Sequence, residues 1–245
     1  MIRTILIVLY LVIFFIIGIP LSLVEAILGR IDTSKRERFA FRYICWGCSC
    51  IRFLSGMQLT MIGYEKVPKD TAVLYVANHR SFFDVIALFP YLNNTTGFVA
   101  KKELLKIPFL RQWMKYVNCE FLDRDNIKQG LKTILSCIAT VKRGCSMFIF
   151  PEGTRSSGTE LLEFKGGSFK IAEKSGCLIV PIAIANTDDV FENHKPYVRK
   201  TQVTIEFGDP IDIKALPKEE QRQIGTRVQA LVAGMLEKNH KTLGF

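Results

Sequence analysis

The sequence is poor in acidic residues, in histidine and in long apolar runs. Of its 245 residues, 23 are Asp or Glu, 33 are Lys or Arg and three are His, which gives a net charge of +10. Only one stretch approaches the roughly 20 apolar residues that a membrane-crossing helix needs, which disfavours a polytopic membrane protein. Apolar residues still make up 49% of the chain, which excludes intrinsic disorder. The length suits one globular domain with an appendage.

Signatures of metal and nucleic-acid binding are also missing. The chain has seven cysteines, and no fourth Cys or His lies near Cys45, Cys48 and Cys50, so we interpret these as packing thiols rather than zinc ligands. Their odd number and apolar surroundings favour reduced thiols in a cytosolic domain. No zinc-finger spacing, RNA-binding signature or basic heptad pattern accompanies the positive charge. We therefore predict neither a metal site nor a nucleic-acid partner.

Residues 5–24 form the most hydrophobic stretch, uncharged and interrupted only by Pro20 and Ser22. As one helix it would reach roughly 30 Å, enough to span the hydrocarbon core of a bilayer. A break at Pro20 would instead give a shorter, re-entrant segment. A cleaved signal peptide is the alternative, but the run exceeds the usual 7 to 15 apolar residues and lacks a small-x-small cleavage site. We predict a retained membrane anchor.

Basic residues crowd just after this run and set its expected orientation. Residues 1–29 hold one charge of each sign, so the rest of the chain carries the whole +10. The cluster consists of Arg30, Lys35, Arg36, Arg38 and Arg42. By the positive-inside rule it places the domain on the cytoplasmic face, and it attracts anionic lipid head groups. Residues 39–54 mix aromatic, apolar and basic side chains, as an interfacial helix or an ordinary buried helix would.

The remaining pattern alternates short apolar runs with longer amphipathic ones. Strands are expected at 59–62, 72–77, 97–100, 119–122, 146–150, 178–183 and 203–207. The clearest helices are 126–143, with Ile127, Leu131, Ile134, Leu135 and Ile138 on one face, Asp125 as cap and Gly144 at its end, and 218–238 after Pro217. This alternation predicts an α/β fold: a single domain with a largely parallel sheet flanked by helices, plus the N-terminal membrane-anchoring segment. We place the anchor and interfacial segment at 1–55 and the domain at 56–245.

The first candidate site follows the strand at 72–77. His79 and Asp84 are five residues apart, so they lie about 140° apart on a helix and on opposite faces of a strand. A turn between strand and helix can pair them, with Asp84 holding one imidazole nitrogen while the other acts as a general base. A surface histidine with Asp84 as a helix cap is the alternative interpretation.

A second candidate site follows the strand at 146–150, where Glu152, Gly153, Thr154 and Arg155 stand at another strand end. Arg155 offers a planar fork of donors suited to phosphate, Gly153 allows close backbone approach and Thr154 can donate a hydroxyl hydrogen bond. Loops after parallel strands converge on one crevice. A base at one strand end and a phosphate clamp at another indicate a transferase that acts on a phosphorylated alcohol.

These blocks resemble the membrane glycerolipid acyltransferases. The resemblance rests on NHRSFFD at 78–84, FLDR at 121–124, FPEGTRS at 150–156 and VPIA at 180–183, with AKKELLKIPFL at 100–110 between the first two. The blocks span about 110 residues in the order expected of the family, and the first and third together are highly specific.

The resemblance implies an enzyme, an O-acyltransferase of phospholipid biosynthesis. His79 would deprotonate the free hydroxyl of 1-acylglycerol 3-phosphate, which attacks the thioester directly and gives phosphatidic acid, and Asp84 would orient His79. Acyl-CoA or acyl-acyl carrier protein is the co-substrate, and no cofactor is implied. The implied acceptor-binding residues are Lys101, Arg124, Glu152, Gly153, Thr154 and Arg155. Lys165, in a similar glycine-bearing loop at 164–167, is a weaker candidate, and a solvated loop lysine is an equally good interpretation. Membrane lipids, the acyl donor and lysophosphatidic acid are the expected partners.

Two departures from the family pattern put the acceptor in doubt. Asn118 stands where relatives often carry glycine, and the basic residue expected after Arg124 is at best Lys128. Glycerol 3-phosphate or another lysophospholipid therefore stays open as the acceptor. A thioesterase in which His79 activates water, or a noncatalytic binder of anionic lipid, are the other hypotheses. We expect His194 and His240 to face solvent.

Overall fold

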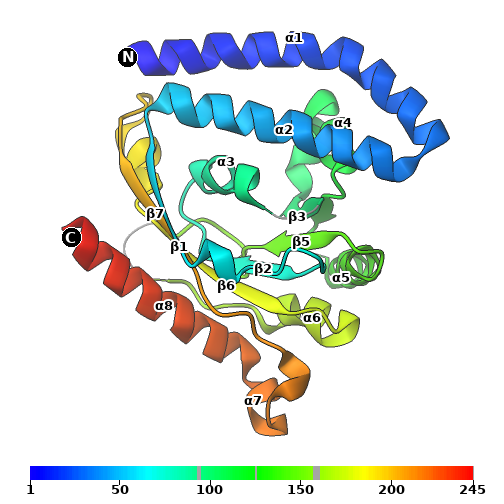
Figure 1. Ribbon diagram of the computed structural model, residues 1–245, viewed down its shortest axis with the longest axis vertical. Coiled ribbons are helices and arrows are strands. Elements are labelled where there is room, and N and C mark those ends of the chain that lie inside the picture. The colour runs from blue at the N-terminus through cyan, green and yellow to red at the C-terminus, as the bar shows by residue number, and fades with distance from the viewer. Residues whose placement is uncertain (93–94, 125, 157–160, 245) are drawn as a thin grey trace.

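A seven-stranded sheet forms the centre of the molecule (Figure 1). The computed structural model describes residues 1–92, 95–124, 126–156 and 161–244. The strand order of the sheet is β1-β7-β6-β2-β5-β3-β4, and every neighbouring pair is parallel except β6 and β7. The strands are β1 (Gln58–Ile62), β2 (Leu74–Ala77), β3 (Thr96–Lys101), β4 (Glu120–Leu122), β5 (Ser146–Ile149), β6 (Ile179–Ala185) and β7 (Gln202–Phe207). The predicted α/β fold with a largely parallel sheet is confirmed, and each predicted strand agrees within two residues at either end.

The central strands are buried on both faces. Every residue of β2, β5 and β6 is buried, which explains their unbroken apolar sequences. Tyr75 and Phe148 point into one core, together with side chains of the N-terminal helices. Leu74 and Met147 point into the second core, which the C-terminal helices cover. The sheet therefore separates two apolar layers.

Helices cover both faces of the sheet. They are α1 (Ile2–Ile31), α2 (Thr33–Ser55), α3 (Phe83–Leu88), α4 (Pro108–Tyr116), α5 (Ile127–Lys142), α6 (Lys170–Ser175), α7 (Lys218–Arg222) and α8 (Ile224–Leu243). Figure 1 shows α1 and α2 running together along one side of the molecule, with α3 between α2 and the sheet. Helix α8 lies on the opposite side, against β6.

The apolar run at the N-terminus is one continuous helix. Helix α1 passes through Pro20 without ending, so the predicted alternative of a break there is wrong. Its length and composition suffice to cross a membrane, and most of its apolar side chains are exposed. The inner side packs on the domain, where the ring of Phe14 stacks on Tyr43 of α2 at 4.4 Å and the Tyr43 hydroxyl donates to the Phe14 carbonyl at 2.5 Å.

Helix α2 combines both interpretations of residues 39–54. Tyr43 is buried against α1, and it also packs on Trp113 of α4, which is itself 3% exposed. Trp46, one turn further along, also packs on Phe14 of α1 but stays 45% exposed, and Phe53 is 80% exposed. The segment therefore buries one side against α1 and α4 while two of its aromatic residues stay exposed.

The helix at 127–142 buries only part of the predicted apolar face, namely Ile138 and, in part, Ile134. Ile127 is 90% exposed, and Leu131 and Leu135 are also exposed. Smaller residues face the sheet instead, and the Thr133 hydroxyl donates to the Phe121 carbonyl of β4 at 3.1 Å. A small inward side chain with a hydroxyl lets the helix lie close to the strand while its polar atom stays hydrogen-bonded.

The predicted helix ends also need correction. Asn126 caps α5 by accepting the Gln129 backbone N–H at 3.0 Å, and the predicted cap Asp125 lies outside the described residues. Gly144 follows the helix with φ of 94°, as its predicted role as terminator requires. The single helix predicted at 218–238 is two helices, α7 and α8, separated at Gln223.

Candidate active site

Residues 78–84 form the candidate catalytic loop, called the catalytic loop from here on. This loop begins where β2 ends, and Asn78 fixes that point. Its side-chain amide donates to the Ile184 carbonyl at 2.9 Å, and its side-chain oxygen accepts the Ile184 N–H at 2.8 Å. Asn78 thus continues the pairing between β2 and β6 after the β2 backbone has left the sheet. The next residue, His79, leaves the sheet at a defined place.

His79 and Asp84 are in contact, as the spacing predicts for a turn. The distance from His79 Nδ1 to Asp84 Oδ2 is 2.7 Å. Asp84 lies in the first turn of α3 and is fully buried, and its Oδ2 also accepts the backbone N–H groups of Arg80 at 2.8 Å and Ser81 at 2.9 Å. The Thr187 hydroxyl donates to Oδ1. An ionised carboxylate only accepts, so Nδ1 carries a proton, and in the neutral imidazole Nε2 then holds the lone pair.

The ring of His79 is held from the side by Phe150. The two rings are stacked, with 4.0 Å between centroids and 17° between planes. Phe150 directly follows β5, the neighbour of β2 in the sheet. The His79 side chain remains 20% exposed. One face of the imidazole is therefore covered while part of the ring stays accessible.

Glu152 holds the backbone of the catalytic loop at His79. Its Oε1 accepts the His79 backbone N–H at 2.6 Å and its Oε2 accepts the Leu162 N–H at 3.0 Å. The residue is 3% exposed. Burial raises the pKa of Glu152, and the two N–H donors oppose that rise. Both carboxylate oxygens are thus engaged with the backbone.

The turn at Gly153 carries the second predicted motif. Gly153 has φ of 76°, in the left-handed region that glycine adopts without strain. A Cβ at this position would come within 3.0 Å of Lys165 Nζ, so the weaker candidate Lys165 lies over the turn. Thr154 is exposed in the same turn. The turn therefore presents a hydroxyl and an ammonium group close together.

Arg155 follows this turn and contacts the catalytic loop. Its guanidinium lies over the ring of Phe82, 3.9 Å from the centroid, and its Nη1 lies 3.2 Å from Glu192 Oε1. Beside it, the Ser156 N–H donates to the His79 carbonyl at 2.9 Å. The two predicted motifs, 73 residues apart at His79 and Glu152, thus form one site.

The other two predicted cationic residues lie at the same edge of the sheet. Lys101 ends β3 and pairs in register with Leu122, the last residue of β4, and Arg124 is exposed two residues further on. Lys101 Nζ lies 3.3 Å from the Glu103 carboxylate. Because β2, β3, β4 and β5 are parallel, their carboxyl ends share one edge with His79.

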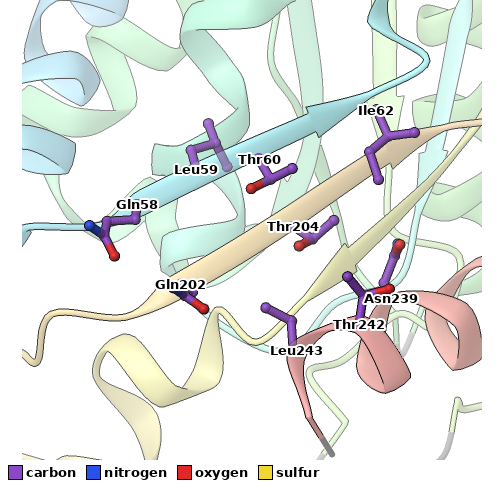
Figure 2. Close-up of a pocket in the computed structure, with 9 residues that line it drawn as sticks. All are labelled: Gln58, Leu59, Thr60, Ile62, Gln202, Thr204, Asn239, Thr242 and Leu243. Atoms are coloured by element: carbon purple, nitrogen blue, oxygen red, sulfur yellow. The ribbon is translucent and has the colours of Figure 1, made fainter.

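An apolar cavity of about 290 Å³ borders the catalytic loop. Phe82 and Phe83 of that loop line one side, Ile7 and Leu11 of α1 line another, and Phe191 closes a third. A wider hollow of about 340 Å³ lies elsewhere, between β1, β7 and the end of α8 (Figure 2). It is lined by neutral residues such as Thr60, Thr204 and Asn239. The cavity beside the catalytic loop is the one in a position to serve the site.

Three residues of the site escape prediction from the sequence. Phe150 ends a predicted strand and opens the FPEGTRS block, but neither signal indicates that it supports His79. Thr187 follows β6 just past the VPIA block, and Glu192 lies in a polar stretch without a motif. The signal that points to Thr187 and Glu192 is their position after the carboxyl end of β6, the neighbour of β2.

His194 and His240 are both only partly exposed, so the prediction that they face solvent holds only in part. His240 lies on α8, and burial together with the charge of Arg80 lowers its pKa. His194 is partly exposed and its Nε2 lies 2.7 Å from Asp189. Asn118, the departure noted in the sequence, has φ of 59° in a turn before β4, at the end of the sheet away from His79. The left-handed region suits Asn as well as Gly, so this substitution concerns the turn rather than the acceptor.

Comparison with known proteins identifies a family and a similar solved structure. The acyltransferase family model matches residues 58–185, more than half of the chain. A 1-acyl-sn-glycerol-3-phosphate acyltransferase of Chlamydomonas reinhardtii is 30% identical over 83% of the chain and 60% of its own length, and one from Borreliella burgdorferi is 28% identical over 77% of each. The crystal structure of the 1-acyl-sn-glycerophosphate acyltransferase PlsC from Thermotoga maritima superposes with a TM-score of 0.80 at 27% identity, covering 97% of this chain and 96% of that one.

The chain belongs to the acyltransferase family. The matched residues 58–185 include both motifs of the site, from Asn78 to Arg155, and end at the last residue of β6. Thr187 and Glu192 lie beyond that match, although both contact the catalytic loop.

Proposed function

We propose that the protein transfers a fatty acyl group from a thioester to the free hydroxyl of 1-acylglycerol 3-phosphate, giving phosphatidic acid. The observation that carries the proposal is the His79 imidazole held through Nδ1 by the buried Asp84, beside the phosphate-binding turn at Gly153. Relatives named for this activity, which match most of the chain, support the same acceptor.

The chemistry follows from the state of the imidazole. His79 Nε2 takes the proton of the acceptor hydroxyl while that oxygen attacks the thioester carbonyl carbon. The tetrahedral intermediate then expels the thiolate, which receives the proton from the imidazolium, so no acyl-enzyme forms. Asp84 stabilises the imidazolium and fixes its orientation, because its own hydrogen bonds hold it in place. A positioned base of this kind contributes about 10²–10⁴-fold in rate.

The acceptor phosphate binds the cationic groups at the same edge of the sheet. Arg155 provides the planar donors, Thr154 and the Gly153 backbone contribute hydrogen bonds, and Lys101 and Arg124 add positive charge. Glu152 acts through the backbone of His79, because both of its carboxylate oxygens are already engaged.

The acyl chain enters the apolar cavity between α1 and the catalytic loop. Its lining is apolar apart from Thr4, and α1 brings a membrane-compatible surface to its wall. The exposed apolar side chains of α1 and the basic cluster after it anchor the enzyme on anionic lipid at the cytoplasmic face. Acyl-CoA or acyl-acyl carrier protein delivers the thioester.

Acyl transfer by the purified protein tests the proposal. A labelled acyl thioester is supplied with lysophosphatidic acid, with glycerol 3-phosphate or with no acceptor, and His79→Ala is assayed in parallel. Phosphatidic acid is expected only with lysophosphatidic acid and intact His79. Product with another acceptor would replace the substrate, free fatty acid alone would indicate a hydrolase, and full turnover by His79→Ala would remove the proposed base.

A further inference from the structure

Glu192 connects the catalytic loop with Arg155, which follows the turn at Gly153. It lies in the segment between β6 and β7, and its side chain is 12% exposed. Its Oε2 accepts the Ser81 hydroxyl at 2.5 Å and its Oε1 accepts the Phe82 backbone N–H at 2.9 Å, both from the catalytic loop. The same Oε1 lies 3.2 Å from Arg155 Nη1. One carboxylate thus bonds to three donors from two loops.

Among the described residues, Glu192 holds Arg155 at one corner of its guanidinium. Nη1 bonds to Glu192, the guanidinium stacks on the ring of Phe82, and the side chain is 36% exposed. An arginine has five N–H donors in a fixed plane. When one nitrogen and one face are fixed, the orientation of the whole fork is fixed, and no described residue outside this pair takes up the other donors, which can serve a ligand.

We infer that Glu192 is a positioning residue that aims Arg155 at the acceptor phosphate and couples it to the loop that carries His79. This inference rests on the proposed function, in which Arg155 binds the phosphate.

The alternative is that Glu192 competes with the phosphate for Arg155. A competing carboxylate must release its arginine and turn away when the phosphate arrives. Glu192 is fixed by Ser81 and Phe82 independently of Arg155, and Ser81 is itself fully buried and accepts the Phe83 N–H at 2.9 Å. The carboxylate therefore stays in place through two loop donors, and its charge remains available to hold Arg155.

Coupling to the base follows from the position of these partners. Ser81 and Phe82 lie between His79 and Asp84 in the same loop, and the Ser81 N–H also bonds to the Asp84 carboxylate at 2.9 Å. Phosphate contacts made by Arg155 are thus transmitted through Glu192 to the loop that orients the base. Binding of the acceptor and alignment of His79 share one carboxylate.

A double-mutant cycle for acyl transfer tests the inference with Glu192→Gln, Arg155→Gln and the double variant. Gln keeps an oxygen toward Phe82 and removes the charge, so the loop is retained while the hold on Arg155 weakens. We expect Glu192→Gln to raise the KM for lysophosphatidic acid about 10-fold with a much smaller change in kcat, since hydrogen bonds to charged groups are the strong ones. In the Arg155→Gln background the same change should leave KM nearly unaltered.

Controls separate this result from general damage. Glu173→Gln removes the same charge from α6, where Glu173 pairs with Lys170 on the surface, and should leave KM and kcat unchanged. Thermal unfolding of each variant checks that the fold is retained.

Each other outcome overturns a stated part of the argument. An unchanged or lowered KM in Glu192→Gln, or an effect that adds fully to that of Arg155→Gln, would overturn the positioning role while Arg155 keeps its own. An unchanged KM in Arg155→Gln would overturn the phosphate-binding role of Arg155, and with it the inference, even if the enzyme still makes phosphatidic acid.

Discussion

The ring of His79 lies nearly parallel to the ring of Phe150, with 4.0 Å between their centroids. Two contacts therefore define the imidazole: the Asp84 carboxylate fixes Nδ1 in the ring plane, and Phe150 supports the ring face. Neither contact alone would fix both the tilt and the rotation of the ring.

Loss of the Phe150 ring that stacks on His79 should slow the reaction without weakening substrate binding. In Phe150→Leu the side chain stays apolar and of similar size, but the parallel ring face is gone. We expect kcat for acyl transfer to fall about 10-fold, because a base displaced by a fraction of an ångström loses alignment with the hydroxyl proton. Steady-state kinetics measures this, and a kcat equal to that of the unchanged protein would show that the stacking is incidental.

The hydroxyl of Thr187 should matter more than its shape. In Thr187→Val the bulk is kept but the hydrogen bond to the fully buried Asp84 is lost. The free energy of unfolding should fall by about 1.5–3 kcal/mol, as for other hydrogen bonds to charged groups, and kcat should fall with it. Thr187→Ser restores the donor and should recover most of both quantities. Equal losses in the Val and Ser variants would assign the effect to packing.

The stability of the protein should carry a pH dependence due to Glu152. Burial raises its pKa in the folded protein above the ordinary 4.5, so the folded state holds this proton more tightly than the unfolded chain. The contribution of this proton to the free energy of unfolding is therefore fully present below about pH 4.5 and is lost as the pH rises through the raised pKa. The variant Glu152→Gln has no carboxyl group here, so its stability does not decrease in this way.

Urea unfolding at a series of pH values measures the effect. The difference in unfolding free energy between the unchanged protein and Glu152→Gln should shift in favour of the variant as the pH rises above about 4.5. Parallel stability curves for the two proteins would contradict the assignment.

Gly97 in β3 should not tolerate a side chain. A Cβ there would lie 2.1 Å from the Asn118 backbone carbonyl oxygen, which a side-chain rotation cannot relieve. We expect Gly97→Ala to destabilise the fold by about 1–3 kcal/mol, as overpacking does. Gly234→Ala is the matched control, since a Cβ on this exposed helical residue meets nothing within 4 Å and should stabilise α8 by up to about 1 kcal/mol.

The sequence predicts the strands and the His79–Asp84 turn because those signals are local. Central parallel strands read as apolar runs, and the five-residue spacing fits only a turn. The buried face of α5 is predictable only in part in this way, because Ile138 is buried as expected but Leu131 and Leu135 stay outside. Apolar periodicity assigns the largest side chains to the core, whereas close helix–strand packing places the smaller Thr133 and Cys137 there as well.

The sequence does not predict Thr187 and Glu192 as part of the site, for a different reason. Thr187 and Glu192 act on residues more than 100 positions earlier in the chain, across the β2–β6 pairing. Nothing in their own neighbourhood marks them. Their role becomes visible only when the strand order places β6 beside β2.

The double hydrogen bond between Asn78 and Ile184 spans 106 residues of sequence, and the Asp84 and Ser81 contacts span similar distances. Such non-local pairings form late in folding, because the loop entropy must be overcome before the contacts stabilise it. Thr187, whose hydroxyl holds the Asp84 carboxylate, lies in the last third of the chain, whereas α1 and His79 lie in the first third. A ribosome therefore completes α1 and the loop of His79 and Asp84 well before it adds the residue that holds this carboxylate from β6.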